Sequence, residues 1–253
     1  MGMLDGKVAL VTAGAGAGIG QAVARRFLEE GADVVLTDAH ARRAKDTGLA
    51  LTSEFGRDVL AMEVDVRSAS QVQAMVDAAA EKYGRIDILF NNAGINKLQP
   101  IWEMDDENWE TILDITLTGT FRCIRAALPH MIERKSGAIV NMASTAGWGA
   151  PSDGEAHYAA AKAGVMALTR AAAAEVAEFG IRVNAIAPSV IYNEFLERIY
   201  PKEMFERMAK SNPMGRLGEP SDVADLALFL VSDRSAYITG DVVCISGGAV
   251  THA

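Results

Sequence analysis

The amino-acid sequence predicts an α/β protein in which one doubly wound parallel sheet is covered by helices on both faces. Short apolar runs rich in β-branched residues alternate with longer segments of helical period, as in parallel strands joined by crossover helices. Half of the 253 residues are hydrophobic and 23 are glycine, so the chain can bury one large core. No repeat, low-complexity tract or linker interrupts the pattern. We therefore expect a single domain over residues 1–253.

The first strand, turn and helix are predicted at the start of the chain. Residues 7–12 (KVALVT) form an apolar run, residues 14–20 (GAGAGIG) a glycine-rich turn, and residues 19–30 a segment of helical period. Glycines permit a tight turn there and let the N–H groups at the start of the helix approach a pyrophosphate. This pattern indicates a Rossmann-type dinucleotide site. The contacts expected in the turn are Gly14, Gly18, Ile19 and Gly20.

The second strand, residues 33–37, is followed by Asp38. An acidic residue about 20 positions after the glycine turn can accept hydrogen bonds from the ribose hydroxyls of NAD, whereas it would repel the 2′-phosphate of NADP. We therefore expect NAD, with NADP kept as the alternative because Arg42 and Arg43 follow closely. A solvated aspartate in a turn is the other interpretation of Asp38.

The same alternation continues to the end of the chain. The further strands are expected at residues 59–64, 86–90, 137–142, 182–187 and 241–245. The further helices are expected at residues 70–83, from about 105, and at 155–179. Several of the strands are apolar throughout, which is typical of strands that are covered on both faces.

Polar or glycine-containing turns follow several of these strands. They are Asp65-Val66, Asn91-Asn92-Ala93-Gly94, Ser144 and Pro188-Ser189. Open α/β sheets bind ligands at the carboxyl edge of the strands, so we expect these turns to meet at one crevice. Asp65 either contacts the adenine side of a cofactor there or caps a helix, and Asn91 and Gly94 could be turn residues only.

A tyrosine and a lysine one helical turn apart lie in the middle of the chain. Tyr158 and Lys162 share a helix face if a helix begins near Glu155. A free tyrosine has a pKa of about 10, and a neighbouring ammonium favours the phenolate and lowers that value. Ser144 could hold a carbonyl or hydroxyl oxygen beside the phenol. The three residues together predict proton transfer at an alcohol or ketone.

At this point the sequence resembles the short-chain dehydrogenase/reductase family over nearly its full length. The shared motifs are the glycine turn, N-N-A-G at 91–94, a serine ahead of Y-x-x-x-K, I-R-V-N-A-I-A-P at 181–188 and Y-I-T-G at 237–240. The resemblance implies hydride transfer between a nicotinamide cofactor and an alcohol or ketone. It implies that Tyr158 exchanges the proton, that Lys162 lowers the tyrosine pKa and binds the nicotinamide ribose, and that Ser144 orients the reacting oxygen.

The resemblance also assigns further contacts and shows departures from the family pattern. Its implied cofactor contacts, beyond the glycine turn and Asp38, are Asp65, Val66, Asn92, Ala93, Gly94, Tyr158, Lys162, Pro188, Val190, Ile191 and Asn193. Ala13 replaces the usual serine or threonine before the first glycine, so a turn hydrogen bond is missing or is supplied by Thr12. Thr116 stands in place of a catalytic asparagine, which predicts a rearranged proton relay. Ser189 replaces the glycine after Pro188.

These departures narrow the resemblance to a branch of actinobacterial reductases associated with the catabolism of steroid rings C and D. The similar features are Ala13, Thr116, Trp148, His157 and the segment 188–196. That branch acts on substrates carried as coenzyme A thioesters. A substrate lid is expected at about residues 190–215, with apolar contacts from Tyr192, Phe195, Leu196, Ile199, Tyr200, Met204, Phe205 and Met208. Ordinary helix core at 3.6-residue spacing is the alternative for these residues.

The sequence therefore predicts an NAD-dependent oxidoreductase that interconverts a secondary alcohol and a ketone on a bulky, apolar, cyclic substrate. One alternative is a 3-oxoacyl-thioester reductase of fatty-acid synthesis that uses NADPH. An alternative of another class is an NAD-binding protein with little turnover. The resemblance also implies a homo-oligomer, either a tetramer or a dimer.

Composition excludes other functions. A net charge of −9 argues against binding nucleic acid, and neither a run of about 18 apolar residues nor a basic leader indicates a membrane segment or export. We expect a cytoplasmic protein. Cys123 and Cys244 have no cysteine or histidine at ligand spacing, and the four histidines are scattered, so no metal site is expected.

Overall fold

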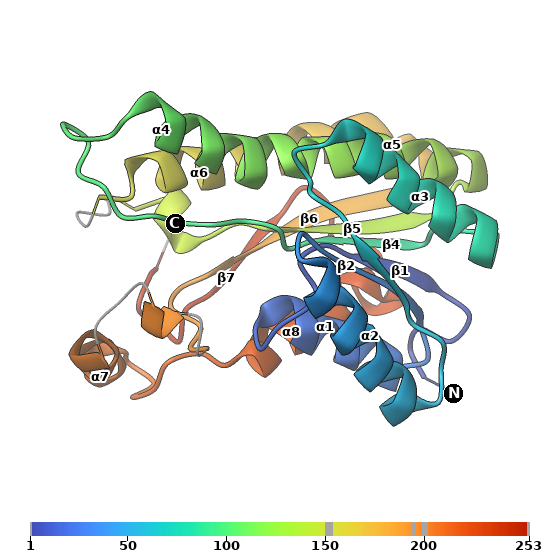
Figure 1. The fold of residues 1–253 in the computed structure, drawn as a ribbon, viewed down its shortest axis with the longest axis horizontal. Helices are drawn as coiled ribbons and strands as arrows, with labels where there is room; N and C mark the ends of the chain where they lie inside the picture. The colour runs from blue at the N-terminus through green and yellow to red at the C-terminus, as the bar shows by residue number, and fades with distance from the viewer. Residues whose placement is uncertain (1, 150–153, 194–195, 199–201, 252–253) are drawn as a thin grey trace.

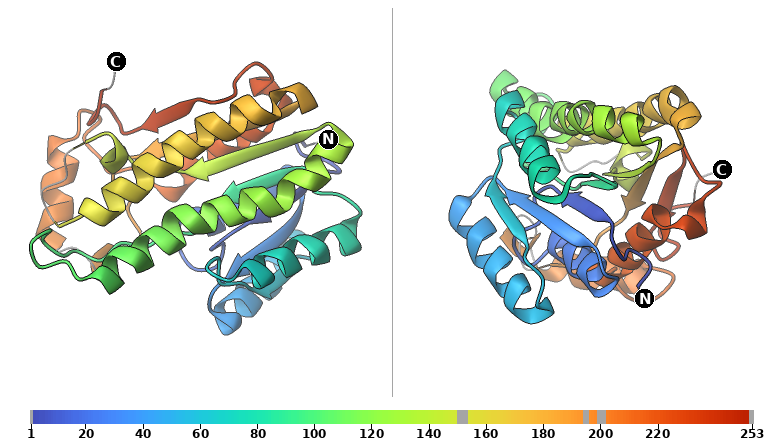
Figure 2. Two further views of the ribbon diagram at one scale, coloured as in Figure 1. Left: turned by 90° about the horizontal axis from the view of Figure 1, so that it is seen from above. Right: turned by 90° about the vertical axis from the view of Figure 1, so that its right-hand side faces the viewer.

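The computed structural model describes residues 2–149, 154–193, 196–198 and 202–251. They form one seven-stranded parallel sheet between two layers of helices (Figures 1 and 2). The strands are β1 (Val8–Val11), β2 (Asp33–Asp38), β3 (Leu60–Glu63), β4 (Ile88–Asn91), β5 (Gly137–Met142), β6 (Ile181–Pro188) and β7 (Val242–Ile245). Their order is β3-β2-β1-β4-β5-β6-β7. The prediction of one doubly wound, Rossmann-type domain is confirmed.

Helices cover both faces of this sheet. They are α1 (Ile19–Glu29), α2 (Ala41–Phe55), α3 (Ala69–Tyr83), α4 (Asp106–Leu113), α5 (Gly119–Arg134), α6 (Ala156–Val176), α7 (Lys202–Ser211) and α8 (Pro220–Val231). In Figure 1, α3, α4, α5 and α6 lie above the sheet, and α1, α2 and α8 lie below it. Because neighbouring strands are parallel, the chain between two strands must cross one face of the sheet to begin the next strand. The helices in these connections therefore form a layer on each face.

Alternate residues of the central strands supply the two cores. In β1, Ala9 and Val11 pack with Phe27 of α1 on one face, while Leu10 packs with Met75 of α3 on the other. All five side chains are fully buried. This two-sided burial explains why the strands are apolar throughout rather than alternating.

Three regions differ from the sequence-based expectation, one of them α8, for which no helix was expected. The helix expected from about residue 105 is α4, a π-helical turn at Asp114–Thr118, and α5 in direct succession. Helix α2 was not expected, because its buried face includes the weakly hydrophobic Thr47 and Gly48 beside Leu51. Its apolar period is therefore faint.

The carboxyl ends of the parallel strands share one edge of the sheet. Asp38 is the last residue of β2, Asn91 of β4, Met142 of β5 and Pro188 of β6. The expected meeting of the turns at one edge is confirmed for these strands. In the part of the chain that the structure describes, none of the helices combines the length and apolarity that a membrane span requires.

Candidate active site

The glycine turn connects β1 to α1 and is held by the turn after β4. The hydroxyl of Thr12 accepts hydrogen bonds from the N–H groups of Asn92 (3.0 Å) and Ala93 (3.1 Å). The Asn92 amide donates to the Ala13 carbonyl at 2.9 Å. The sequence left open whether Thr12 replaces the hydrogen bond that Ala13 cannot make. In the structure, Thr12 forms the hydrogen bonds that fix this turn. Ala13 itself has a positive φ of 47°.

The geometry of the turn fits a pyrophosphate. A Cβ on Gly20 would lie 2.4 Å from the Ala13 carbonyl oxygen and 2.6 Å from the Asn92 amide nitrogen, so the backbone approach requires glycine. Gly18 is the N-cap of α1 and provides no side-chain cap to the first-turn N–H groups. These donors and the positive end of the helix dipole suit a negatively charged group.

Asp38 lies at the end of β2 beside an arginine. The residue is 2% exposed, and Oδ1 accepts hydrogen bonds from the His40 N–H (2.9 Å) and the Arg43 guanidinium (2.6 Å). A Cβ at Gly16 would lie 3.5 Å from Arg43, so the guanidinium stem runs along the glycine turn. Asp38 is therefore not a solvated turn residue. A carboxylate and a guanidinium share the expected ribose position.

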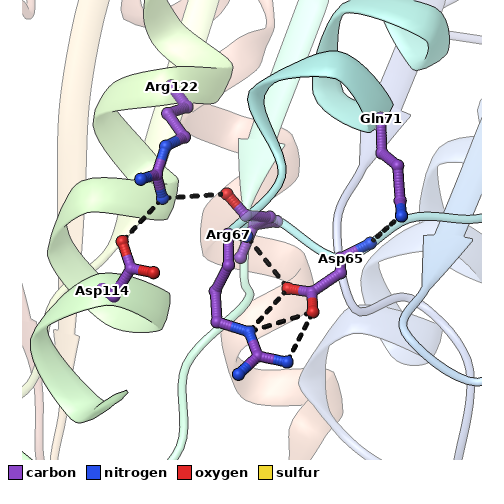
Figure 3. Close-up of polar contacts among 6 residues, drawn as sticks. Asp65, Arg67, Gln71, Asp114 and Arg122 are labelled. Atoms are coloured by element: carbon purple, nitrogen blue, oxygen red, sulfur yellow. Dashed lines mark hydrogen bonds and ion pairs between the residues drawn. The ribbon is translucent and has the colours of Figure 1, made fainter. Parts of the chain in front are cut away.

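Asp65 follows β3 and binds its neighbour Arg67 (Figure 3). Its carboxylate accepts from the Arg67 N–H at 2.9 Å and from the guanidinium at 2.6 Å. The hydrogen bond from the Arg67 side chain is the main reason that the pKa of Asp65 is lowered. The helix cap of α3 is Ser68, whose hydroxyl accepts from the Gln71 N–H at 3.3 Å. The helix-cap interpretation of Asp65 is therefore wrong.

An arginine on α5 joins this loop to the π-helical turn. Arg122 donates to the Asp114 carboxylate at 2.7 Å and to the Val66 carbonyl at 3.4 Å, as Figure 3 shows. A Cβ on Gly119 would lie 2.6 Å from the Val66 side chain, so the loop packs tightly on the start of α5. Sequence reasoning missed this link, because Asp114 and Arg122 are eight positions apart across a change of helix type.

Thr116 lies within the π-helical turn and is fully buried. Its hydroxyl accepts from the Ile95 N–H at 3.4 Å. A Cβ at Gly94 would lie 3.4 Å from the Lys162 ammonium and 3.6 Å from the Thr116 hydroxyl. Gly94, Thr116 and Lys162 therefore meet at one point. π-Helical turns occur often at functional sites because they displace a side chain from the regular helical register.

Ser144, Tyr158 and Lys162 lie together, as predicted. Ser144 follows β5 and lies close enough to the Tyr158 phenol to favour its ionised form. The Lys162 ammonium lies 5.5 Å from the centre of the Tyr158 ring and donates to the Met142 carbonyl at 2.6 Å. Tyr158 and Lys162 are one turn apart on α6. The arrangement can hold a carbonyl oxygen between a hydroxyl and a phenol.

Burial shifts both titrating groups of this pair. It raises the pKa of Tyr158 to about 12, an increase that the Ser144 hydrogen bond opposes and the charge of Glu155 adds to. It lowers the pKa of Lys162, a side chain 4% exposed, to about 8. The expected lowering of the Tyr158 pKa is therefore wrong for the protein without cofactor, because removing the phenolate from water costs more than the hydrogen bond returns.

The Lys162 shift predicts a pH-dependent stability. Between about pH 8 and the ordinary lysine pKa of 10.5, the folded protein gives up a proton that the unfolded chain keeps, so the free energy of unfolding rises with pH. We expect the free energy of unfolding to rise by on the order of 2 kcal/mol from pH 8 to 10, relative to Lys162→Met. Urea titrations of both proteins without cofactor measure this difference. If the difference in the free energy of unfolding between the two proteins did not change with pH, the lowered pKa of buried Lys162 would be contradicted.

Tyr158 lines a cavity of about 290 Å³. Its lining residues are Ile19, Asn96, Ser144, Thr145, Ala146, Glu155, Tyr158, Pro188, Ser189, Val190, Ile191, Asn193, Leu196, Met204, Phe205 and Met208. The contacts expected at Ile19, Pro188, Val190, Ile191 and Asn193 therefore lie around the same cavity as the catalytic candidates.

The segment expected to form a lid supplies much of the apolar wall of this cavity. Met204, Phe205 and Met208 come from α7, and the Phe205 ring packs edge-to-face on Tyr192 with centroids 5.6 Å apart. Met204 and Met208 are half-buried at the cavity, whereas Phe205 is buried, as the alternative of helix core expects. Phe195, Ile199 and Tyr200 lie outside the described residues.

His157 links the beginning of α6 to the loop after β4 through hydrogen bonds. Its Nδ1 accepts from the Tyr158 N–H at 2.8 Å, and its Nε2 lies 2.9 Å from the Lys97 carbonyl oxygen. Asn108 of α4 lies 3.3 Å from the same nitrogen. His157 was named in the sequence only as a feature shared with the reductase branch, because its hydrogen bonds to Lys97 and Asn108 join residues that are distant in sequence. Among the described residues, no group of histidine, cysteine or acidic side chains could hold a metal ion.

Comparisons with known proteins agree over nearly the whole chain. A family model described as enoyl-(acyl carrier protein) reductase matches residues 14–250. A (5R,7aS)-5-hydroxy-7a-methyl-1-oxo-2,3,5,6,7,7a-hexahydro-1H-indene-carboxyl-CoA reductase of Mycobacterium tuberculosis is 47% identical over 246 residues, 97% of this chain and 94% of that protein. A 3-oxoacyl-[acyl-carrier-protein] reductase of Staphylococcus aureus is 37% identical over 242 residues, 96% of this chain and 97% of that protein.

Solved structures give the same result. The crystal structure of a short chain dehydrogenase from Mycobacterium smegmatis superposes with a TM-score of 0.86 at 45% identity, covering 100% of this chain and 95% of that one. A short-chain dehydrogenase/reductase structure from Burkholderia xenovorans has a TM-score of 0.92 at 34% identity, covering 98% of both chains.

Proposed function

Because the chain belongs to the short-chain dehydrogenase/reductase family and is an oxidoreductase, we propose that it is NAD-dependent and interconverts a secondary alcohol and a ketone on a bulky cyclic substrate. The observation that carries the proposal is the Ser144–Tyr158–Lys162 cluster at the wall of a largely apolar cavity. The similarity to the mycobacterial indene-carboxyl-CoA reductase supports a steroid-degradation intermediate carried as a coenzyme A thioester.

The mechanism follows from the groups at the cavity. In reduction, Ser144 and Tyr158 hold the carbonyl oxygen, and Tyr158 donates its proton to that oxygen as charge develops there. The nicotinamide, when bound, supplies the hydride. The high pKa of Tyr158 keeps the phenol protonated before reaction, which suits a proton donor. Lys162 then stabilises the phenolate through its positive charge, and the proton is replaced through the polar groups near Thr116.

The same geometry proposes where the cofactor is held. The glycine turn with Gly14, Gly18, Ile19 and Gly20 takes the pyrophosphate, and Asp38 takes the adenine ribose. The residues proposed on the adenine side and around the nicotinamide are Asp65, Val66, Asn92, Ala93, Gly94, Pro188, Val190, Ile191 and Asn193.

The preference for NAD is tested by replacing Asp38. Asp38→Ser removes an acceptor for ribose hydroxyls and the repulsion of a 2′-phosphate, while Arg43 remains. We expect the ratio of kcat/KM for NADH to that for NADPH to fall by at least about tenfold, or about 1.4 kcal/mol. Steady-state kinetics with both cofactors measure it. Asp46→Ser, on the exposed side of α2, is the matched control and should leave the ratio unchanged.

The alternative of an NADPH-dependent 3-oxoacyl-thioester reductase is supported by the position of Arg43. Arg43 at the ribose position could hold a 2′-phosphate, and the Staphylococcus aureus relative is a 3-oxoacyl-[acyl-carrier-protein] reductase. A strong preference of the unmodified enzyme for NADPH together with rapid turnover of linear 3-oxoacyl thioesters would favour this alternative. Tight cofactor binding without turnover of any alcohol or ketone would instead favour an NAD-binding protein.

We also propose a cytoplasmic homo-oligomer, either a tetramer or a dimer. Apolar side chains of α4 and α5, including Trp109 and Phe121, are more than one third exposed in the isolated chain, which favours association. Cys123 and Cys244 are both free thiols, as is usual in a reducing compartment. Sedimentation equilibrium of the purified protein tests the oligomeric state.

A further inference from the structure

Among the residues that the structure describes, one carboxylate, that of Glu155, lines the substrate cavity. Among the described residues that line it, Glu155 and Tyr158 carry the ionisable side chains, and the others are apolar or neutral. A wall of this composition can accommodate an apolar ring system at many points. A charged side chain in this wall is costly to remove from water, so the charge of Glu155 must affect which molecules bind in the cavity.

Hydrogen bonds from the loop after β4 fix the position of Glu155 and of the residue before it. Its Oε1 accepts a hydrogen bond from the Asn96 amide at 2.5 Å, and Asn96 also lines the cavity. Next to it, the Gly154 carbonyl accepts from the Gln99 N–H at 2.9 Å. The loop after β4 thus binds both this carboxylate and the backbone beside it, which keeps the carboxylate at the cavity.

The carboxylate also lies close to the reacting centre. Glu155 is three residues before Tyr158, at the N-cap of α6, and its negative charge is felt at the phenol, where it helps to raise the pKa of Tyr158. The field that disfavours a phenolate must also disfavour a carboxylate on any substrate placed beside it, since both are anions in the same poorly solvated space. A neutral ketone or thioester does not experience this repulsion.

We propose that Glu155, held by Asn96, is a specificity-determining residue that makes the cavity reject free carboxylic acids and accept the same ring system when its acid is masked as a thioester or ester. This inference rests on the proposed function, because it concerns the substrate of the same cavity. It implies that the reaction that supplies the substrate is one that activates a carboxylic acid as a thioester.

The test compares one bicyclic keto acid with its methyl thioester. Glu155→Gln keeps the shape of the side chain and an oxygen that can accept from Asn96, but removes the charge. We expect the ratio of kcat/KM for the acid to that for the thioester to rise about tenfold in Glu155→Gln, a change of about 1.4 kcal/mol. Glu107→Gln, an exposed residue of α4, removes the same charge away from the cavity and should leave the ratio unchanged.

A binding measurement keeps the inference separate from the proposed function. Titration calorimetry of the keto acid and the thioester into the NAD-loaded enzyme requires no turnover. Weaker binding of the acid, relieved by Glu155→Gln, would support the charge filter even if neither compound were reduced, an outcome that would count only against the proposed reaction. Equal discrimination by the unmodified enzyme and Glu155→Gln, in kinetics and in binding, would overturn the inference. Thermal unfolding of each variant checks that it is folded.

Discussion

Tyr158→Phe should lower kcat by about 10²–10⁴-fold, the range that a general acid contributes. The phenol is a proton donor at the wall of the cavity, and phenylalanine preserves the ring and its packing on α6. Ser144 can still hydrogen-bond to the substrate but cannot donate a proton as readily. Reduction of a cyclic ketone under saturating NADH measures the change.

Cofactor binding is the control for Tyr158→Phe. The proposed pyrophosphate and ribose contacts, Gly20 and Asp38, are untouched by this substitution, so the dissociation constant for NADH should change by less than about threefold. Fluorescence titration gives that value. Retained turnover in the variant would sink the assignment of Tyr158 and would direct attention to another proton donor at the cavity.

Lys162→Met should also cause a large loss of activity, for an electrostatic reason. The ammonium, 5.5 Å from the Tyr158 ring, stabilises the phenolate that forms when the proton is transferred, and methionine fills the space without the charge. We expect kcat for reduction to fall by about 10²-fold or more, together with weaker cofactor binding if Lys162 contacts the ribose.

The pH profile of the unmodified enzyme tests the same role. Burial lowers the pKa of Lys162 to about 8, so its charge is present below that pH and is lost above it. The rate of reduction should therefore decline as the pH rises through about 8, and Lys162→Met should lack this decline. A profile that is identical in both enzymes would assign the titration to another group.

The sheet could be predicted from the sequence because its chemistry is local. Strands such as β1 are buried on both faces and so are continuously apolar, and the glycine turn needs small residues where Gly20 meets the Ala13 carbonyl. Tyr158 and Lys162 could be paired because one helical turn separates them. These local sequence patterns can be recognised without knowledge of the rest of the fold.

The remaining features depend on contacts between distant segments. A π-helical turn has no residue composition of its own, so the change of helix type around Thr116 was not predictable, although the family resemblance placed Thr116 at the site. The direction of the Tyr158 pKa shift depends on how deeply helix α6 is buried, which no motif states. The hydrogen bond between Asn96 and Glu155 joins residues 59 positions apart, and only the folded chain brings them to one cavity.

One kinetic comparison tests the central claim most directly. It measures kcat/KM of the unmodified enzyme for reduction of a bicyclic ketone that carries a thioester, with NADH and then with NADPH. The account predicts turnover with both cofactors and a preference for NADH, because Asp38 ends β2 at the ribose position. The absence of turnover with either cofactor, in an enzyme that binds NADH tightly, would contradict it.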